Sequence, residues 1–291
     1  MKKFVNFDDL DVDMEGVRRL NKIGVAGCGV VGEATAQALE GQMYEVVRYD
    51  IKHHPDTLDE LLTCDVVFIC VSAPTKNGIV SIHNIVDVIE KLSYEQAIVI
   101  KSTVPPMTTK MLYDKYEGTR RILHSPEFLT AGNAIHDAMY PERVYVGIPD
   151  ESLRSLAEDV MVLLTVWASE SEIYDSTTTE MIKYACNGFL TTKVIYSNVI
   201  HDICVNFGID SSTVLASMGA DHRIGTSHTT VTADGGRGAG GMCFPKDLAA
   251  MCSFGSVNPR AELMLNSLQI INDYYLKASG KDIDIIEALT D

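Results

Sequence analysis

The sequence predicts an α/β protein in which a doubly wound parallel sheet is followed by an all-helical domain. Short β-branched, apolar segments alternate with helical stretches up to about residue 175, a spacing typical of strand–helix–strand units. From about residue 176, strand-like segments give way to long helical patterns. We therefore expect an N-terminal extension at residues 1–20, a sheet domain at 21–175 and a helical domain at 176–291. The expected strands cover residues 23–27, 45–50, 65–71, 97–100, 121–123 and 144–148, and the clearest helices cover 33–40, 82–92, 179–207 and 259–277.

Bulk composition limits the classes of protein to which the chain can belong. Its 291 residues are 46% hydrophobic and 22% charged, an ordinary balance for a folded soluble protein. The formal net charge of −16 argues against a general affinity for nucleic acid or an anionic membrane, because both need a positive surface. Seven cysteines without zinc-type spacing fit a reducing compartment, and no apolar run is long enough to span a bilayer. We expect a cytoplasmic protein with no metal site.

A glycine-rich turn connects the first predicted strand to the first predicted helix. The segment Gly27-Cys28-Gly29-Val30-Val31-Gly32 has the G-x-G-x-x-G spacing that lets a backbone approach a pyrophosphate at a helix N-terminus. The next strand ends at Asp50, about 20 residues on, where a Rossmann-type fold places the carboxylate that binds the ribose of NAD. Asp50 favours NAD over NADP, although nearby Lys52 weakens that discrimination. The expected cofactor contacts in this Rossmann-type domain are Gly27, Gly29, Val30, Val31, Gly32 and Asp50.

Three loops that follow predicted strands carry polar residues. Ser72 and Pro74 follow the strand at 65–71, and Thr103 follows the strand at 97–100. Because the carboxyl ends of parallel strands meet at one edge of a sheet, we expect these residues near the cofactor. Glu127 follows the next strand, and a carboxylate there could be a general base or merely a helix cap. The local motif does not decide between these two roles.

Cys243 stands at a predicted helix start and follows a loop at residues 235–241 that contains five glycines, here called the glycine loop. Pro245 suits the first turn of a helix, and Asp247 lies one turn beyond Cys243 on the same face. A sulfur near the unpaired N–H groups of a helix N-terminus gains thiolate character, and the upstream glycines let the backbone approach a ligand closely. A small buried apolar cysteine is the alternative. The loop favours a reactive thiol.

Two polar residues of the long helix at 179–207 project together. Lys183 and Asn187 are four residues apart, so an ammonium and an amide share one face and could bind an oxyanion. An ordinary solvated polar face is the alternative. The last helix, at 259–277, has apolar residues on more than one face, which suggests packing on several sides, as in a dimer.

Taken together, these motifs resemble the UDP-glucose/GDP-mannose dehydrogenase family over nearly the whole chain after Asn21. The segments that carry the resemblance are the glycine turn at 27–32, Val71-Ser72-Ala73-Pro74, Lys101-Ser102-Thr103-Val104-Pro105, Ser125-Pro126-Glu127-Phe128-Leu129, Lys183-Tyr184-Ala185-Cys186-Asn187, Asp221-His222-Arg223-Ile224-Gly225 and Gly240-Gly241-Met242-Cys243-Phe244-Pro245-Lys246-Asp247.

The resemblance implies an NAD-dependent enzyme that oxidises the C6 primary alcohol of a nucleotide sugar such as UDP-glucose to a carboxylate, reducing two NAD. It implies that Cys243 is the nucleophile, through a thiohemiacetal and a thioester. Lys183 and Asn187 would stabilise the oxyanions, and Asp247 and Thr103 would position water. Glu127 would be the base in hydrolysis. The implied substrate contacts are Glu127, Phe128, Leu129, Lys183, Asn187, Gly240, Gly241 and, across the interface of a homodimer, Arg223.

Because of two departures from the family pattern, the sequence does not establish how tightly the chain binds the nucleotide part of the substrate. Family members continue into a third, nucleotide-binding domain to which this sequence does not extend, and Ala239 stands where the family commonly has Phe. Two alternatives therefore remain. One is an NAD-binding subunit or pseudoenzyme that needs a partner domain. The other is a dehydrogenase of the 3-hydroxyacid type, which has no need of a thiol.

Overall fold

A seven-stranded sheet forms the first half of the protein. The computed structural model describes residues 20–166, 168–232 and 235–280, so the predicted extension at 1–20 lies almost entirely outside the described residues. The strand order is β2-β1-β3-β6-β7-β8-β9. These strands are β1 (Lys22–Ala26), β2 (Glu45–Tyr49), β3 (Val66–Ile69), β6 (Ala97–Ile100), β7 (Arg121–His124), β8 (Arg143–Ile148) and β9 (Glu170–Asp175).

Helices cover both faces of this sheet, as a doubly wound fold requires. One apolar core lies between the sheet and helices α1 (Val30–Gly41) and α6 (Arg154–Leu164). The opposite core includes residues of α2 (Leu58–Leu61), α3 (His83–Lys91) and α4 (Thr108–Lys115). Strands β1, β3 and β6 are buried on both faces, which explains their uninterrupted apolar sequences. The predicted α/β class is confirmed.

The sheet differs from the prediction in two ways. β8 pairs antiparallel with β7 and parallel with β9, so the sheet is mostly but not wholly parallel. Strand composition carries no information on direction, which is why the sequence did not reveal this. β9 was not predicted, because this edge strand has the largely polar sequence Glu-Ser-Glu-Ile-Tyr-Asp and five of its six residues are exposed.

A short hairpin was also missed. Strands β4 (Thr75–Lys76) and β5 (Ile79–Val80) flank Asn77-Gly78, both of which have positive φ, the sequence signature of a tight hairpin turn. A Cβ added at Gly78 would lie 3.2 Å from Ala249 O. The hairpin therefore packs against a helix of the second half of the chain. Two short 3-10 helices, at Pro55–Thr57 and Glu151–Leu153, complete the sheet domain together with α5 (Ala134–Met139).

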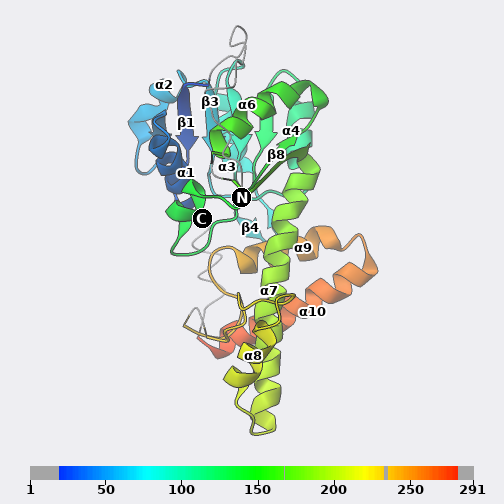
Figure 1. Cartoon of the computed structure of the whole chain (residues 1–291). Helices are drawn as coiled ribbons and strands as arrows, with labels where there is room; N and C mark the ends of the chain where they lie inside the picture. The colour runs from blue at the N-terminus through cyan, green and yellow to red at the C-terminus, as the bar shows by residue number, and fades with distance from the viewer. Residues whose placement is uncertain (1–19, 167, 233–234, 281–291) are drawn as a thin grey trace.

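The second half of the described chain is helical, as predicted. It contains α7 (Ser176–Asn206), α8 (Ser211–Gly219), α9 (Phe244–Gly255) and α10 (Pro259–Ala278). α7 begins directly after β9, where the Asp175 carboxylate accepts a hydrogen bond from Thr178 N, and it runs for 31 residues from the sheet to the far end of the molecule (Figure 1). No helix in the described ranges is long and apolar enough to cross a membrane.

α7 approaches the sheet very closely at Gly147 of β8. A Cβ at Gly147 would overlap Thr179 Oγ1 and would lie 2.8 Å from Ser176 Cα, so only glycine permits this distance. Thr179 in turn hydrogen-bonds to the ring of buried His124, with 2.8 Å between Oγ1 and Nδ1. The first turn of α7 is thereby fixed to the central strands.

Glu180 makes a second contact between α7 and the sheet domain. Its Oε1 accepts hydrogen bonds from Thr109 N at 2.7 Å and Thr109 Oγ1 at 2.6 Å, in the first turn of α4. Its Oε2 has no hydrogen-bond partner among the described residues, and the side chain is fully buried. Burial raises the pKa of Glu180 to about 7, although the hydrogen bonds from Thr109 oppose this shift.

This carboxyl should make the stability of the protein depend on pH. Its folded pKa of about 7 lies above its ordinary value of 4.5, so between those two pH values the folded protein binds more protons than the unfolded chain. The free energy of unfolding should therefore fall as pH rises through this window. Glu180→Gln should flatten that fall, as measured by urea unfolding at several pH values from 5 to 8. An unchanged slope in the variant would contradict the assignment.

Candidate active site

The glycine turn leaves open space at the N-terminus of α1. Gly27 has a φ of +92°, and a Cβ there would lie 2.8 Å from the backbone of Cys70. A Cβ at Gly32 would overlap Gly27 O, whereas a Cβ at Gly29 would meet no atom within 4 Å. Gly29 is the N-cap of α1 and makes no side-chain cap, so the first N–H groups of the helix, from Val30 and Val31, face this open side. The turn can therefore receive an anion such as a pyrophosphate.

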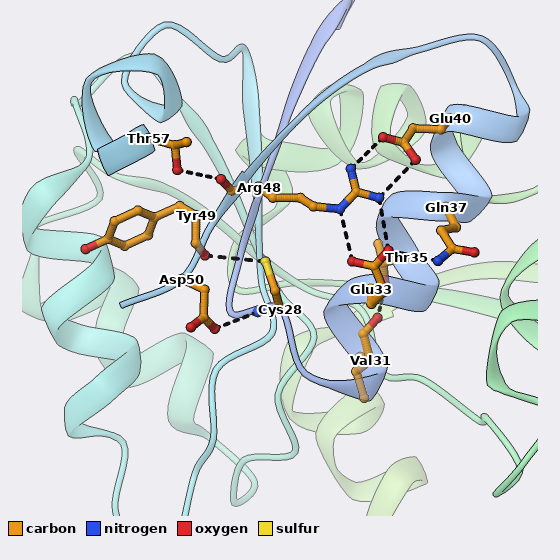
Figure 2. A network of polar contacts seen from close by, with 10 residues as sticks. All are labelled: Cys28, Val31, Glu33, Thr35, Gln37, Glu40, Arg48, Tyr49, Asp50 and Thr57. Atoms are coloured by element: carbon orange, nitrogen blue, oxygen red, sulfur yellow. Dashed lines mark hydrogen bonds and ion pairs between the residues drawn. The ribbon is translucent and has the colours of Figure 1, made fainter. Parts of the chain in front are cut away.

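Asp50 lies beside this turn, as predicted (Figure 2). Its Oδ2 accepts a hydrogen bond from Cys28 N at 2.9 Å, and its Oδ1 accepts from Lys52 N at 2.8 Å and His53 N at 3.1 Å. Burial opposes ionisation, but these three N–H groups hold the pKa of Asp50 below its ordinary value. A carboxylate offers about four acceptor positions, so capacity remains for a ribose hydroxyl.

Arg48, two residues before Asp50, is committed to α1. Its guanidinium donates to Glu33 at 3.0 and 3.2 Å and to Glu40 at 2.5 and 2.9 Å (Figure 2). These two carboxylates compensate its charge. Arg48 therefore offers no free cation for the 2′-phosphate of NADP, and the arrangement around Asp50 fits NAD.

The other predicted cofactor residues lie at the same edge of the sheet. Ser72 and Pro74 follow β3, and the side-chain amide of Asn84 donates to Ser72 O at 3.0 Å. Half-buried Thr103 follows β6, the neighbour of β3, and the adjacent Ser102 Oγ donates to Val71 O at 2.6 Å. The two loops are thus tied to each other next to the glycine turn.

A cavity of about 1080 Å³ lies between the sheet edge and the helical half of the chain. Eight of the predicted site residues line it, namely Glu127, Phe128, Leu129, Lys183, Asn187, Gly240, Gly241 and Cys243. Thr103, Asp247 and Arg223 are not among its lining residues. Arg223 is exposed and pairs with Asp221 at 2.5 Å, away from the cavity of its own chain.

Glu127 and Lys183 form an ion pair inside this cavity. Lys183 Nζ lies 2.7 Å from Glu127 Oε1, and Glu127 Oε2 accepts a hydrogen bond from Leu129 N at 2.7 Å. Burial works to raise the pKa of Glu127, but Lys183, the Leu129 N–H and Lys101 hold it below the ordinary value. No helix begins at Glu127, since α5 starts at Ala134 with Asn133 as its N-cap. The structure therefore excludes the role of helix cap.

Asn187 and Asp247 form a second polar group beside the pair. The Asn187 side-chain amide donates to Asp247 Oδ2 at 2.6 Å, and Lys246 Nζ lies 2.6 Å from Asp247 Oδ1. Asp247 is buried, and its N–H bonds to Cys243 O at 3.0 Å. The carboxylate predicted one turn beyond the cysteine is present there, but both of its oxygens are already engaged.

Cys243 is the N-cap residue of α9 and is exposed. The expectation of extra thiolate character is not met. Burial raises the pKa of the Cys243 thiol. The carboxylates of Asp247 and Glu127 act in the same direction, and the ammonium groups of Lys246 and Lys183 oppose them. The sequence indicated the helix N-terminus and Asp247, but it did not show that burial and Glu127, from another part of the fold, also raise this pKa.

Two further cations line the cavity and were not predicted as site residues. Lys101 is buried, donates to Ser125 O at 3.3 Å, and has a pKa lowered by burial. The Arg143 guanidinium lies over the Phe128 ring at 4.2 Å and 3.7 Å from Cys186 Sγ. Lys101 belongs to a motif already noted, whereas nothing in the sequence distinguishes Arg143 from an ordinary surface arginine.

Comparison with known families gives two adjoining matches. Residues 53–164 match the NAD binding domain of the UDP-glucose/GDP-mannose dehydrogenase family, and residues 177–274 match its central domain. Together these matches cover more than half of the chain. The first match begins after the glycine turn and Asp50, so the geometry described above is the evidence for that part of the cofactor site.

Individual relatives agree with these matches. A UDP-glucose 6-dehydrogenase from Rickettsia bellii is 33% identical over 251 residues, which are 78% of this chain and 56% of the relative. A UDP-glucose dehydrogenase structure from Pyrobaculum islandicum superposes with a TM-score of 0.77 at 24% identity, covering 88% of this chain and 68% of that one. A 3-hydroxyisobutyrate dehydrogenase from Mycobacterium tuberculosis superposes with a TM-score of 0.63 at 17% identity, covering 93% and 99% of the two chains. Both superpositions show the fold alone.

The chain spans about half the length of the curated relatives it matches. Within that span, both domain matches concern one family, and the glycine turn, Asp50 and the cavity agree with them. The chain therefore belongs to the UDP-glucose/GDP-mannose dehydrogenase family.

Proposed function

We propose that this protein oxidises the C6 primary alcohol of a nucleotide sugar, UDP-glucose or a close relative, to a carboxylate with NAD. The observation that carries this proposal is the position of Cys243. Cys243 lines the same cavity as Asn187 and the Lys183–Glu127 ion pair. A 3-hydroxyacid dehydrogenase would need no thiol at this place.

When bound, NAD accepts a hydride from the substrate carbon in each of the two oxidations. The N-terminus of α1 would hold its pyrophosphate, and Asp50 would accept a hydrogen bond from its ribose. Ser72, Pro74 and Thr103 would contact the part of the cofactor that reaches the sheet edge. The open space at Gly29 and the position of the two loops support these assignments.

In the first oxidation, C6 loses a hydride and its hydroxyl loses a proton, which gives an aldehyde. We assign the proton to water held by Thr103 and Asp247. Asp247 does not line the cavity but bonds to Asn187, which does, and each of its oxygens has one partner and keeps a further acceptor position. Sγ of Cys243 then forms a bond to C6. Because burial raises the pKa of this thiol, it is mostly protonated at neutral pH, so its proton can pass to the aldehyde oxygen as the thiohemiacetal forms.

In the second oxidation, C6 of the thiohemiacetal loses a hydride and its hydroxyl a proton, which leaves a thioester. A water oxygen then attacks the thioester carbon, Glu127 takes a proton from that water, and the C–S bond breaks to release the carboxylate and the thiol. Glu127 suits this role because its pKa is held low, so it is a carboxylate before the reaction. Two NAD are reduced for each sugar.

Lys183 and Asn187 would stabilise the negative oxygen of the tetrahedral intermediates. An ammonium has three N–H donors and an amide has two, so each retains a donor beyond its bond to Glu127 or Asp247. Donors fixed in advance by such bonds need no reorganisation when charge develops. Phe128, Leu129, Gly240 and Gly241 would contact the sugar and the diphosphate along the cavity wall.

We also propose that two copies of the chain associate through α7 and α10. Both helices expose apolar residues at intervals of seven, namely Phe189, Tyr196 and Ile203 on α7, and Leu263 and Ile270 on α10. That repeat is typical of helices that pack against a partner helix. Exposed Arg223 would then be able to reach the partner's cavity. Sedimentation of the purified chain should give a dimer, and a monomer at every concentration would refute this assembly.

Cys243→Ala should stop the reaction between the two oxidations. We expect at most about one NADH per sugar instead of two, with the aldehyde released, because no thioester can form. Cys252→Ala in the same helix is the matched control, since this half-buried thiol does not line the cavity. Production of the uronic acid by Cys243→Ala at the normal rate would rule out the covalent mechanism.

Alanine at two glycines of the turn should separate cofactor binding from folding. Gly29→Ala places a Cβ in the open space, so it should weaken NAD binding by about tenfold or more while the melting temperature stays unchanged. Gly32→Ala should lower the melting temperature, because its Cβ would overlap Gly27 O. Calorimetry with NAD and then UDP-glucose provides the measurement, and Gly41→Ala is the control.

Binding of NAD without any binding of a nucleotide sugar would favour a subunit that needs a partner domain.

A further inference from the structure

We propose that Asn272 of α10 is a positioning residue for Cys243, acting through the backbone of the glycine loop. This inference rests on the function proposed above. Asn272 is not among the residues lining the cavity, so any effect on the reaction must pass through the loop.

The Asn272 side chain binds both backbone groups of one loop residue. Its Oδ1 accepts a hydrogen bond from Ala239 N at 2.7 Å, and its Nδ2 donates to Ala239 O at 3.0 Å. Both residues are buried, with 1% of each exposed. Two bonds from one planar amide fix the direction of the Ala239 backbone as well as its position, and burial removes water as a substitute partner.

Gly238 brings the loop into direct contact with the same helix. A Cβ at Gly238 would lie 3.1 Å from Tyr275 Cβ and 3.2 Å from Leu276, and both of these residues are buried. The φ of Gly238 is +84°, which favours glycine. The backbone therefore lies against α10 with no side chain between them.

Arg237 anchors the loop on the other side. Its guanidinium pairs with Asp202 at 2.6 Å, donates to Asn198 Oδ1 at 3.0 Å and lies over the Tyr275 ring at 4.2 Å. The Tyr275 hydroxyl in turn donates to Asp202 Oδ2 at 2.7 Å. Three successive residues, 237 to 239, are thus held by α7 and α10.

Only Gly240, Gly241 and Met242 separate this anchored segment from Cys243. A chain of four residues reaches at most about 14 Å, so the position of Ala239 restricts where Cys243 can lie. Two glycines give this link unusual freedom, and Gly241 has open space around it. On the other side, α9 is held through Asp247 by Asn187. The thiol therefore stands between two fixed points, and loss of Asn272 would release one of them.

The test compares Asn272→Ala and Asn272→Asp with the full chain. The aspartate keeps an acceptor for Ala239 N but loses the donor to Ala239 O, so it tests the proposal even if the alanine variant does not fold. Ser267→Ala is the matched control on α10, because its exposed hydroxyl bonds only within its own helix, to Leu263 O. For each variant we would measure amide hydrogen exchange of the peptide that spans residues 238–243. We would also measure kcat, KM for NAD and the number of NADH formed per sugar.

We expect exchange at residues 238–243 to accelerate about tenfold or more in both Asn272 variants. The second oxidation should slow about tenfold or more, so that NADH per sugar falls below two. KM for NAD should stay within about twofold, because the side-chain hydrogen bonds of Asn272 are to Ala239 and not to the glycine turn at 27–32. Faster exchange with normal kcat and two NADH per sugar would overturn the proposal and leave Asn272 a structural residue. Unchanged exchange would also overturn it.

The two proposals fail in different ways. If the full chain makes no uronic acid from any nucleotide sugar, the proposed function fails, but the exchange measurement still shows whether Asn272 holds the loop. If Cys243→Ala blocks the second oxidation and Asn272→Asp does not slow it, the function stands and the positioning role is wrong.

Discussion

The close contact between α7 and β8 at Gly147 determines where the polar residues of the site can lie. α7 is one continuous helix, so fixing Thr179 and Glu180 against the sheet also fixes Lys183 and Asn187 one and two turns further on. A side chain at position 147 would push the helix away and move both residues with it. The ion pair between Lys183 and Glu127, at 2.7 Å, depends on this distance, because its partners come from the two halves of the protein.

Two ion pairs lie in and beside the cavity. Lys183 faces Glu127, and Lys246 faces Asp247, which also accepts the Asn187 amide. In each pair a nearby carboxylate compensates the charge of a lysine. Burial is the main cause of the raised pKa of Cys243, and the carboxylates of Asp247 and Glu127 act in the same direction. In the proposed mechanism this thiol is protonated at rest, and its proton passes to the aldehyde oxygen as the C–S bond forms.

The sequence revealed the parts of this site whose signals are local. The glycine turn, Asp50 and the cysteine loop each have their pattern within a few residues, and buried strands such as β3 are recognisable from uninterrupted apolar residues. Other features depend on contacts between distant segments, and the sequence did not predict them. They are the direction of β8, the polar edge strand β9 and the pairing of Lys183 with Glu127. Asn272 was missed for the same reason: it is one of several polar residues of α10, and nothing in the sequence indicates that it alone is buried against a loop.

The glycine loop needs support from outside itself, and this need explains the role proposed for α10. Glycines let the backbone come close to a ligand, but they also leave many conformations accessible, so a thiol at the end of such a loop is poorly placed by the loop alone. An aromatic residue at position 239 would be too large for the buried place that Ala239 occupies beside Asn272. The loop is held there by two hydrogen bonds to the backbone of residue 239, and these bonds do not involve its side chain. In the proposed role, the small side chain at position 239 is what lets α10 hold the loop through its backbone.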